Sequence, residues 1–394
     1  MADDVVITGL GIVSSIGCNE ERFWESLRTG RSGASAVDAI DTTDLTRTIA
    51  CQVREPIDVD RPMGRAAKLA VAAARQAVSG AGLSASELSG LPMPIIIGTT
   101  MGETGFIENR LQGPDEQWLN KEHVGQILGG KPGSIAGHVQ TDLGVIGQAT
   151  DLYGACAAGN MAIEAARRQL LEGRCDVAIA GGADGFSQLA FIGFMRLRVM
   201  AAEICRPFDE NRDGLLVGEG AVTFVLERES TAKARGAKIR ARVLGGAITC
   251  ENYHPTRPHP EGDGLTRATR LAVADAGLRP EDIDYVCAHG TGTPQNDAIE
   301  VKVLQNCFPR GVAFSSIKAL TGHPMGAAAA TEAAVCLLSL EHQELIPTWH
   351  LENLLQPCAA DAVVGQVRPV RAKYVLNNSA GFGGYNSSIV LAAA

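Results

Sequence analysis

One cysteine of this sequence stands where a nucleophile would be useful. Cys156 lies in the stretch YGACAAGNMAIEAARRQLLEG, among small residues at the start of an alanine-rich helix that we expect to close at Gly173. Most of the ten cysteines are expected to be plain core residues, because cysteine is small and apolar. A helix N-terminus, however, lowers the pKa of a thiol through its unpaired N–H groups and its dipole. The same N–H groups could stabilise an oxyanion, so Cys156 is a candidate to attack a thioester.

Two histidines and a lysine follow in the second half of the chain. His289 lies in AHGTGTPQND, just past a strand, and His323 lies in KALTGHPMGAAAATE, where we expect a helix to begin. Either histidine alone would be interpreted as a turn residue bonded to the backbone. Together with Lys318, and with Cys156 at a matching place in the other half, they predict one site that joins a nucleophile to two imidazoles.

The elements that must position these residues alternate between strand and helix. In the first half we expect strands at 5–14, 93–100, 175–184 and 221–229, and helices at 20–29, 64–80 and after Cys156. In the second half we expect a strand at 238–250, a strand ending in a polar loop at 285–293, helices at 265–278 and 321–340, and two strands around the last glycine-rich turn. The repeated plan predicts an α/β layered sandwich (α-β-α-β-α) of two duplicated halves, 1–237 and 238–394. The alanine-rich helices should be buried between two sheets.

Composition and charge exclude several classes of function. The chain has 394 residues, a net charge of −9 and no apolar run long enough to cross a membrane. The negative charge argues against general nucleic-acid binding. The cysteines show no CxxC pairs or metal-ligand spacing, so we expect no metal. The acidic start MADDVVITGLG does not resemble a secretory signal, so reduced thiols in the cytoplasm are expected.

With these motifs in order, the sequence resembles a β-ketoacyl-acyl carrier protein synthase of the elongating kind, a condensing enzyme with the thiolase fold. The resemblance spans essentially the whole chain. It is carried by VVITGLGIVSSIG, the Cys156 stretch, RPFDENRDGLLVGEGA, HGTGTPQND, SSIKALTGHPMGAA and NNSAGFGGYN. The relative that primes chains from coenzyme A thioesters uses Cys, His and Asn, so the two histidines favour the elongating branch.

The resemblance implies the reaction and its central residues. Cys156 would accept an acyl group from a carrier protein, and His289 and His323 would act on malonyl-carrier protein. Loss of carbon dioxide would leave a carbanion that attacks the acyl-cysteine and extends the chain by two carbons. No metal or organic cofactor is implied.

Further residues take supporting roles in the same resemblance. Lys318 and Glu332 would supply supporting charges, and Glu332 could face Lys318 from its helix. Phe382 would be the gating residue, and its N–H would join that of Cys156 in the oxyanion hole. Thr291 and Thr293 could bond the pantetheine amide, or could merely stabilise their turn.

The resemblance also implies partners. Acyl carrier protein is acidic, so this acidic chain needs a local positive patch, and Arg61, Arg65 and Lys68 lie where the family docks its carrier. A solvated helix face is the alternative interpretation of these three residues. The family forms twofold dimers, which leaves a homodimer or a heterodimer with a related ketosynthase-like subunit. No membrane or nucleic-acid partner is expected.

The pathway is left open between primary fatty acid elongation and, slightly preferred, type II polyketide or polyene synthesis. Ala380 stands where the family has Phe, and Tyr385 replaces a usual Thr. The space at Ala380 could be refilled by Tyr385 or Trp118, or used to admit a bulkier acyl chain. A thiolase, a malonyl decarboxylase and a chain-length-factor-type partner subunit are less favoured, because this chain has GFGG where a thiolase has a second cysteine and keeps Cys156, which the other two usually lack.

Overall fold

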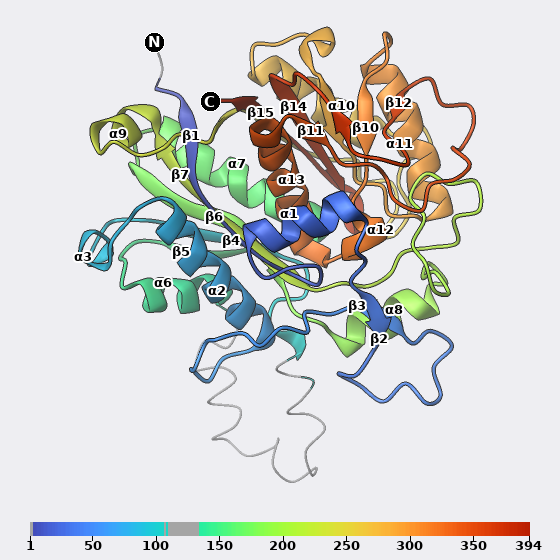
Figure 1. The fold of residues 1–394 in the computed structure, drawn as a ribbon, viewed down its shortest axis with the longest axis horizontal. Coiled ribbons are helices and arrows are strands. Elements are labelled where there is room, and N and C mark those ends of the chain that lie inside the picture. The colour runs from blue at the N-terminus through green and yellow to red at the C-terminus, as the bar shows by residue number, and fades with distance from the viewer. Residues whose placement is uncertain (1–2, 106–107, 109–133) are drawn as a thin grey trace.

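The large sheet organises the whole chain (Figure 1). A computed structural model describes residues 3–105, 108 and 134–394. Eleven of the described strands form one sheet. Its strands are β1 (Val5–Ser14), β4 (Ile95–Thr99), β5 (Ala149–Tyr153), β6 (Val177–Asp184), β7 (Gly220–Arg228), β8 (Ala241–Cys250), β9 (Tyr285–Cys287), β10 (Ala313–Ser315), β12 (Asp361–Ala362), β14 (Tyr374–Ala380) and β15 (Tyr385–Ala393). Two small hairpin-like pairs lie apart from it, namely β2 (Ala34–Ala36) with β3 (Ile49–Cys51) and β11 (Glu344–Leu345) with β13 (Arg368–Pro369).

The two halves of the sheet share one strand order. The order is β5-β4-β6-β7-β1 in the first half and β10-β9-β14-β15-β8 in the second, with β12 added beside β10. If the strands of each half are numbered in chain order, with β12 left out, both halves have the order 3-2-4-5-1 across the sheet. The halves join because β1 and β8 pair antiparallel at Val6 and Ile7, so the two sheets expected from the sequence are two halves of a continuous one. We propose residues 237 and 238, between α9 and β8, as the boundary of the halves.

Helices cover both faces of each half. They are α1 (Glu20–Thr29), α2 (Arg65–Gly80), α3 (Ala85–Leu88), α6 (Ile135–Leu143), α7 (Ala158–Leu171), α8 (Gln188–Arg196), α9 (Glu229–Ala234), α10 (Asp263–Asp275), α11 (Pro294–Cys307), α12 (Lys318–Thr321) and α13 (Ala328–His342). Helices α2 and α6 pack on the first half, α10 packs on the second with α11 beside it, and α7 and α13 contact strands of both halves (Figure 1). The layers are therefore helix, sheet, helix, sheet, helix, which confirms the expected fold class.

The central helices depend on small side chains. All residues from Ala328 to Leu340 of α13 are buried. A Cβ on Gly159 of α7 would lie 2.5 Å from the backbone nitrogen of Ala330, so glycine is required where the two helices meet. Alanine-rich sequence therefore permits close packing on every side of these helices. None of the described helices is both long and apolar enough to cross a membrane.

Both central helices begin with the same strained turn. A 3₁₀ turn at Ala155–Ala157 precedes α7, and another at Met325–Ala327 precedes α13. Ala155 and Met325 each have a φ of 49°, a left-handed conformation that is uncommon outside glycine. Cys156 and Gly326 consequently occupy equivalent positions at the two helix starts.

Most of the expected elements are confirmed, and one is wrong at the site. The predicted helix over 321–340 is broken: α12 ends at Gly322, which has a φ of 63°, and Pro324 delays the next helix until 328. His323 therefore lies in the break rather than at the start of a helix. The predicted strand and polar loop over 285–293 are confirmed: the strand ends at Cys287, and a loop with positive φ at Gly290 and Gly292 follows it.

Candidate active site

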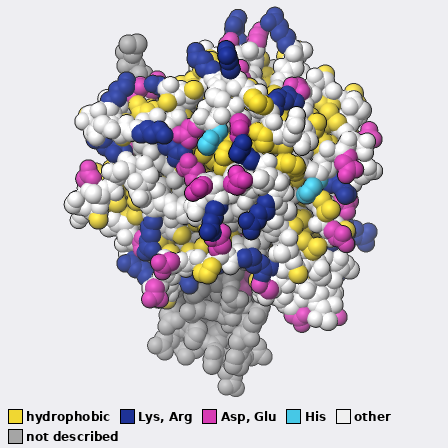
Figure 2. All heavy atoms as spheres, viewed as in Figure 1, with side chains coloured by type: hydrophobic (Ala, Val, Ile, Leu, Met, Phe, Trp, Pro, Cys, Tyr) yellow, Lys and Arg dark blue, Asp and Glu magenta, His cyan; other side chains and the backbone are white. Residues whose placement is uncertain are grey.

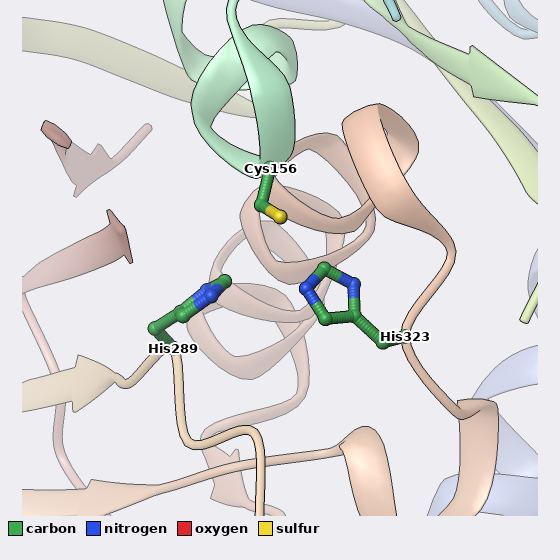
Figure 3. Close-up of side chains that lie close together, drawn as sticks. All are labelled: Cys156, His289 and His323. Carbon is green, nitrogen blue, oxygen red and sulfur yellow. The ribbon is translucent and has the colours of Figure 1, made fainter. Parts of the chain in front are cut away.

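Three separate elements bring Cys156, His289 and His323 together (Figure 3). Cys156 lies in the 3₁₀ turn before α7, His289 in the loop after β9, and His323 in the break before α13. The sulfur and one ring nitrogen of each histidine all lie within 4.8 Å of one another. The ring centroids are 5.3 Å apart with the planes at 82°, so both imidazoles face the thiol. Among the described residues, no other group of His, Cys, Asp and Glu has a spacing that could hold a metal ion.

Both imidazoles are neutral near pH 7. Burial holds the pKa of His289 and of His323 well below 6.5, and the positive charge of Lys318 lowers both further. Each side chain is only 2% exposed. A neutral imidazole has one nitrogen that donates and one that accepts, so each ring can donate a single hydrogen bond into the site.

The thiol differs from the expectation based on its helix. Burial raises the pKa of Cys156 to about 12, although Lys318 and a hydrogen bond from the Phe382 backbone favour the thiolate. The expected lowering of the pKa at a helix N-terminus is therefore outweighed by desolvation. The resting protein holds a protonated thiol, and the proton must leave as the sulfur attacks.

Two backbone N–H groups converge beside the sulfur. The N–H of Phe382 donates to the thiol of Cys156. A Cβ on Gly381 would lie 3.1 Å from the backbone nitrogen of Cys156, so glycine keeps this N–H accessible. The hydroxyl of Ser379 donates to the carbonyl oxygen of Cys156 at 3.0 Å and fixes the turn. The N–H of Phe382 therefore lies beside the sulfur, and Gly381 leaves space in front of the N–H of Cys156.

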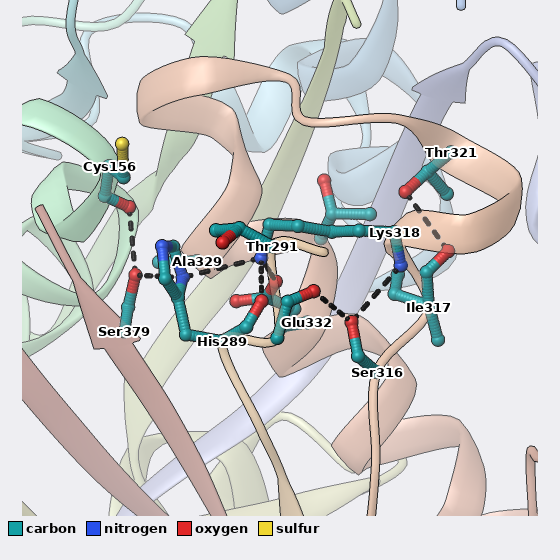
Figure 4. Close-up of polar contacts among 12 residues, drawn as sticks. Cys156, His289, Thr291, Ser316, Ile317, Lys318, Thr321, Ala329, Glu332 and Ser379 are labelled. Carbon is teal, nitrogen blue, oxygen red and sulfur yellow. Dashed lines mark hydrogen bonds and ion pairs between the residues drawn. The ribbon is translucent and has the colours of Figure 1, made fainter. Parts of the chain in front are cut away.

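Lys318 links His289 to a buried acid (Figure 4). Its Nζ lies 3.3 Å from Nδ1 of His289 and donates to the carbonyl oxygen of His289 at 2.5 Å. The same ammonium pairs with the carboxylate of Glu332, and both side chains are 1% exposed. Burial raises the pKa of the Glu332 carboxyl, while Lys318 opposes the shift. The Ser379 hydroxyl lies 3.3 Å from the same Nδ1 but donates to Cys156, so the contact with the ammonium favours the tautomer with its proton on Nε2.

Sequence reasoning missed two acids that hold the His289 loop. The carboxylate of Glu300 accepts from the N–H groups of His289 and Gly290, each at 2.7 Å. Asp297 accepts from the N–H of Thr291 at 3.0 Å and from that of Phe208 at 2.7 Å. Both acids lie on α11, directly after the loop in HGTGTPQNDAIE. The signal in the sequence was a pair of acids directly after a glycine-rich loop. The N–H groups of such a loop have no strand partners and need other acceptors.

The trio opens into a cavity of about 380 Å³. Thr291 and Thr293 line it, and their hydroxyls are hydrogen-bonded to each other at 2.8 Å. Ala380 lines it too, as does Phe382, whose ring lies 5.6 Å from that of Phe194.

Of the two candidates to refill the space at Ala380, only Tyr385 lies among the described residues. Tyr385 is absent from the described lining and is 38% exposed. Trp118 lies outside the described residues. Within the described part of the chain, the side of the cavity at Ala380 is therefore not filled by Tyr385.

The three basic residues proposed for carrier docking are not equivalent. The guanidinium of Arg65 points inward and pairs with buried Glu219, with Nη2 and Oε1 2.7 Å apart. Its side chain is still 38% exposed, so Arg65 stays a proposed docking residue whose charge is partly offset by Glu219. Arg61 is exposed, 3.9 Å from a carboxylate oxygen of Asp142, and Lys68 is half-buried.

Comparison with known proteins identifies the family. "Beta-ketoacyl synthase, N-terminal domain" matches residues 2–232, and "Beta-ketoacyl synthase, C-terminal domain" matches residues 240–352. The chain is 34% identical over 408 residues to 3-oxoacyl-acyl-carrier-protein synthase 2 of Synechocystis, covering 98% of this chain and 97% of that protein. The same enzyme of Staphylococcus aureus is 35% identical over 405 residues with the same coverage. The chain belongs to the β-ketoacyl synthase family, and it is an acyltransferase of the 3-oxoacyl-acyl-carrier-protein synthase kind.

Solved structures agree with this assignment. The ishigamide ketosynthase/chain length factor superposes with a TM-score of 0.93 at 36% identity, covering all of both chains. A type II polyketide ketosynthase in complex with its acyl-carrier protein has a TM-score of 0.91 at 27% identity, again over all of both chains. A β-ketoacyl synthase from Burkholderia phymatum has a TM-score of 0.91 at 30% identity.

Proposed function

We propose that the protein extends an acyl chain held on Cys156 by decarboxylative condensation with malonyl-acyl carrier protein, within type II polyketide or polyene synthesis. The convergence of Cys156, His289 and His323 in one cavity carries the proposal. The likeness to the ishigamide ketosynthase/chain length factor supports the pathway.

In the first half-reaction the acyl group moves to Cys156. The sulfur attacks the thioester carbonyl, the bond between carbonyl carbon and carrier sulfur breaks, and the carrier thiolate receives the proton. The N–H groups of Cys156 and Phe382 stabilise the intermediate oxyanion, and loss of one such donor typically costs about 100- to 1,000-fold in rate.

In the second half-reaction two neutral imidazoles act on the malonyl thioester. His289 and His323 each donate one hydrogen bond to the thioester oxygen, where negative charge develops as carbon dioxide leaves. Lys318 keeps the donor proton of His289 on the nitrogen away from itself. The resulting carbanion attacks the acyl-Cys156 carbonyl, forms the new C–C bond and expels the cysteine sulfur.

Fatty acid elongation is the second candidate. One observation favours it, and another favours polyketide synthesis. The two curated relatives named above are 3-oxoacyl-acyl-carrier-protein synthases 2, at 34% and 35% identity. Against this, Ala380 leaves space in the cavity wall where a Phe is expected for the family. A wider wall favours a bulky or conjugated chain, and we therefore prefer the polyketide or polyene pathway.

The partner of this reaction is an acyl carrier protein, which we propose enters at the cavity mouth. Arg198 and Arg257 line the mouth, are exposed, and form no ion pair with any described residue. Over the face shown in Figure 2, basic and acidic side chains are interspersed rather than gathered into one basic field. The proposed docking surface for the acidic carrier thus consists of these cations at the mouth, together with Arg61 just before α2 and Arg65 and Lys68 on α2.

We propose that a twofold dimer forms along β5. This strand lies at the edge of the described sheet, and its last residue Tyr153 is 57% exposed, as is the nearby Ile146 at 55%. An open edge with apolar side chains is a surface that proteins cover. The second subunit is either another copy or a related ketosynthase-like chain. The ten cysteines are all free, which supports the cytoplasm as the compartment.

Acyl loading and carbon dioxide release test the proposal separately. Purified protein is incubated with matched saturated and polyene acyl-carrier proteins, and peptide mass spectrometry locates the acyl group, which we expect on Cys156 alone. Cys156→Gln should still release carbon dioxide from malonyl-carrier protein, whereas His289→Ala and His323→Ala should lose most of that release. An acyl adduct on another cysteine with Cys156 free, or loss of decarboxylation in a folded Cys156→Gln protein, contradicts the mechanism.

A further inference from the structure

The 3₁₀ turns that precede α7 and α13 have the same backbone geometry, but different groups lie against them. Strand β14 approaches the turn of Cys156, and strand β6 approaches the equivalent turn of Gly326. Ser379 of β14 donates to the carbonyl oxygen of Cys156, and a Cβ on Gly182 of β6 would lie 2.7 Å from the carbonyl oxygen of Gly326. The register is therefore the same at both sites.

Two residues further along each strand, the sites diverge. Directly after β14 this position is Gly381, whose missing Cβ leaves the N–H of Cys156 open to substrate. In β6 it is Asp184, whose Oδ2 accepts from the N–H of Gly326 at 2.6 Å. Where one half of the fold keeps an empty oxyanion hole, the other half fills the equivalent hole with its own carboxylate.

The filled hole is fully satisfied. Oδ2 of Asp184 also accepts from the N–H of Thr100 at 2.8 Å, and Oδ1 accepts from the N–H of Met101 at 2.9 Å and the hydroxyl of Thr99 at 2.6 Å. Asp184 has no exposed surface. Four donors around one buried carboxylate hold the end of β4 against the turn before α13.

That turn is the support of a catalytic side chain. Gly326 follows His323 by three residues, and no helix lies between them. Within the described chain, His323 Nδ1 has no hydrogen-bond partner, so the ring is oriented through its backbone and packing. We propose that Asp184 is a positioning residue: it clamps the Met325–Gly326 turn, which sets His323 for the malonyl step, and it places a fixed negative charge near Cys156.

The charge has a measurable consequence at the thiol. Asp184 raises the pKa of Cys156, as Glu332 does, whereas Lys318 lowers it. Burial raises the pKa of Asp184 itself to about 6, so the group is ionised above that pH. Among the described residues, Glu103 and Tyr153 also interact electrostatically with Asp184. Removing the Asp184 charge must therefore shift the alkylation of Cys156 toward lower pH.

The test compares Asp184→Asn with a matched control. Asp284→Asn makes the same change at a carboxylate that accepts two backbone N–H groups, from Lys373 and Tyr374, at the far end of β14. For Asp184→Asn we expect carbon dioxide release to fall about 10- to 100-fold, as for a misplaced catalytic group, and the pH profile of Cys156 alkylation by iodoacetamide to move to lower pH. Asp284→Asn should change neither. A folded Asp184→Asn protein with an unmoved alkylation profile and full decarboxylation overturns the proposal.

A second variant keeps the test decisive if the first does not fold. Thr99→Val removes one donor to Asp184 and leaves the charge, so decarboxylation should fall severalfold while the alkylation profile stays in place. Unchanged decarboxylation in Thr99→Val overturns the clamp. The role of Asp184 in the malonyl step rests on the proposed function; if the wild-type protein releases no carbon dioxide, that function fails, and the alkylation comparison still tests the charge.

Discussion

Nζ of Lys318 lies 3.3 Å from Nδ1 of His289, inside a core where both side chains are almost completely excluded from water. An ammonium can only donate, so this contact favours the tautomer in which Nδ1 of His289 accepts and Nε2 carries the proton. The same ammonium pairs with Glu332, whose second carboxylate oxygen has no partner among the described residues. One lysine therefore sets the tautomer of the histidine and balances the charge of the acid.

Replacing Lys318 should separate these two roles. Lys318→Met leaves Glu332 unpaired, and breaking a buried ion pair typically costs about 3–5 kcal/mol of stability. Lys318→Met combined with Glu332→Gln removes both charges and should recover most of that loss in a thermal unfolding experiment. Carbon dioxide release should stay about 10- to 100-fold low in both proteins, because His289 has lost the group that holds its tautomer. Full activity of the double variant would show that Lys318 serves only the fold.

Gly381 offers a direct test of the oxyanion hole. Gly381→Ala places a Cβ 3.1 Å from the backbone nitrogen of Cys156, at a residue whose φ of −128° any side chain tolerates. Acyl transfer to Cys156 should fall about 100- to 1,000-fold, the typical cost of losing one donor. Gly80→Ala is the control, since its Cβ would meet nothing closer than 3.8 Å. Normal loading by Gly381→Ala would remove this N–H from the mechanism.

The pH dependence of decarboxylation follows from the two neutral imidazoles. Burial and Lys318 lower the pKa of His289 and of His323. Both rings therefore stay neutral, and keep their hydrogen-bond donors, as the pH falls. Decarboxylation by Cys156→Gln should stay flat between about pH 8 and 6.5. Were both pKa values about 6.5, only about a quarter of the molecules would keep two neutral rings at pH 6.5. A decline of that size over this range would contradict the burial of the pair.

The sequence predicted the chemistry of the site better than its geometry. Cys156, His289 and His323 could be found because motif order and residue type identify them, and β1 and α1 could be bounded because their apolar patterns are regular. The inward turn of Arg65 could not be predicted, since its partner Glu219 lies far away in the chain and enters through the fold. The raised pKa of Cys156 could not be predicted either. A sequence shows that a residue stands at the start of a helix, but desolvation depends on how the chain packs.

Charge reversal at the cavity mouth should weaken carrier recognition. Arg198→Glu with Arg257→Glu should slow turnover with acyl-carrier protein and reduce its dependence on salt, while turnover of a small pantetheine thioester remains near normal. Lys238→Glu is the matched control, because its side chain is 82% exposed and does not line the cavity. Arg65→Glu is unsuitable, since it would place a second negative charge against buried Glu219. Equal salt dependence in the wild-type and doubly reversed proteins would remove the mouth from the docking surface.

Ala380 is the residue that should decide which acyl chains are accepted. It lines the cavity that contains Cys156, and Tyr385 does not fill the adjacent space. Ala380→Phe adds an aromatic ring at this wall, so a rigid or conjugated chain, which cannot bend around the ring, should lose far more than a flexible saturated one. The measurement compares the loading of matched saturated and polyene acyl-carrier proteins on the wild-type and Ala380→Phe proteins. The loading of short saturated chains on the same two proteins is the reference. Because overpacking alone would hinder every substrate, an equal loss for both classes would mean that Ala380 only packs the wall, and the preference for polyene synthesis over fatty acid elongation would lose its structural support.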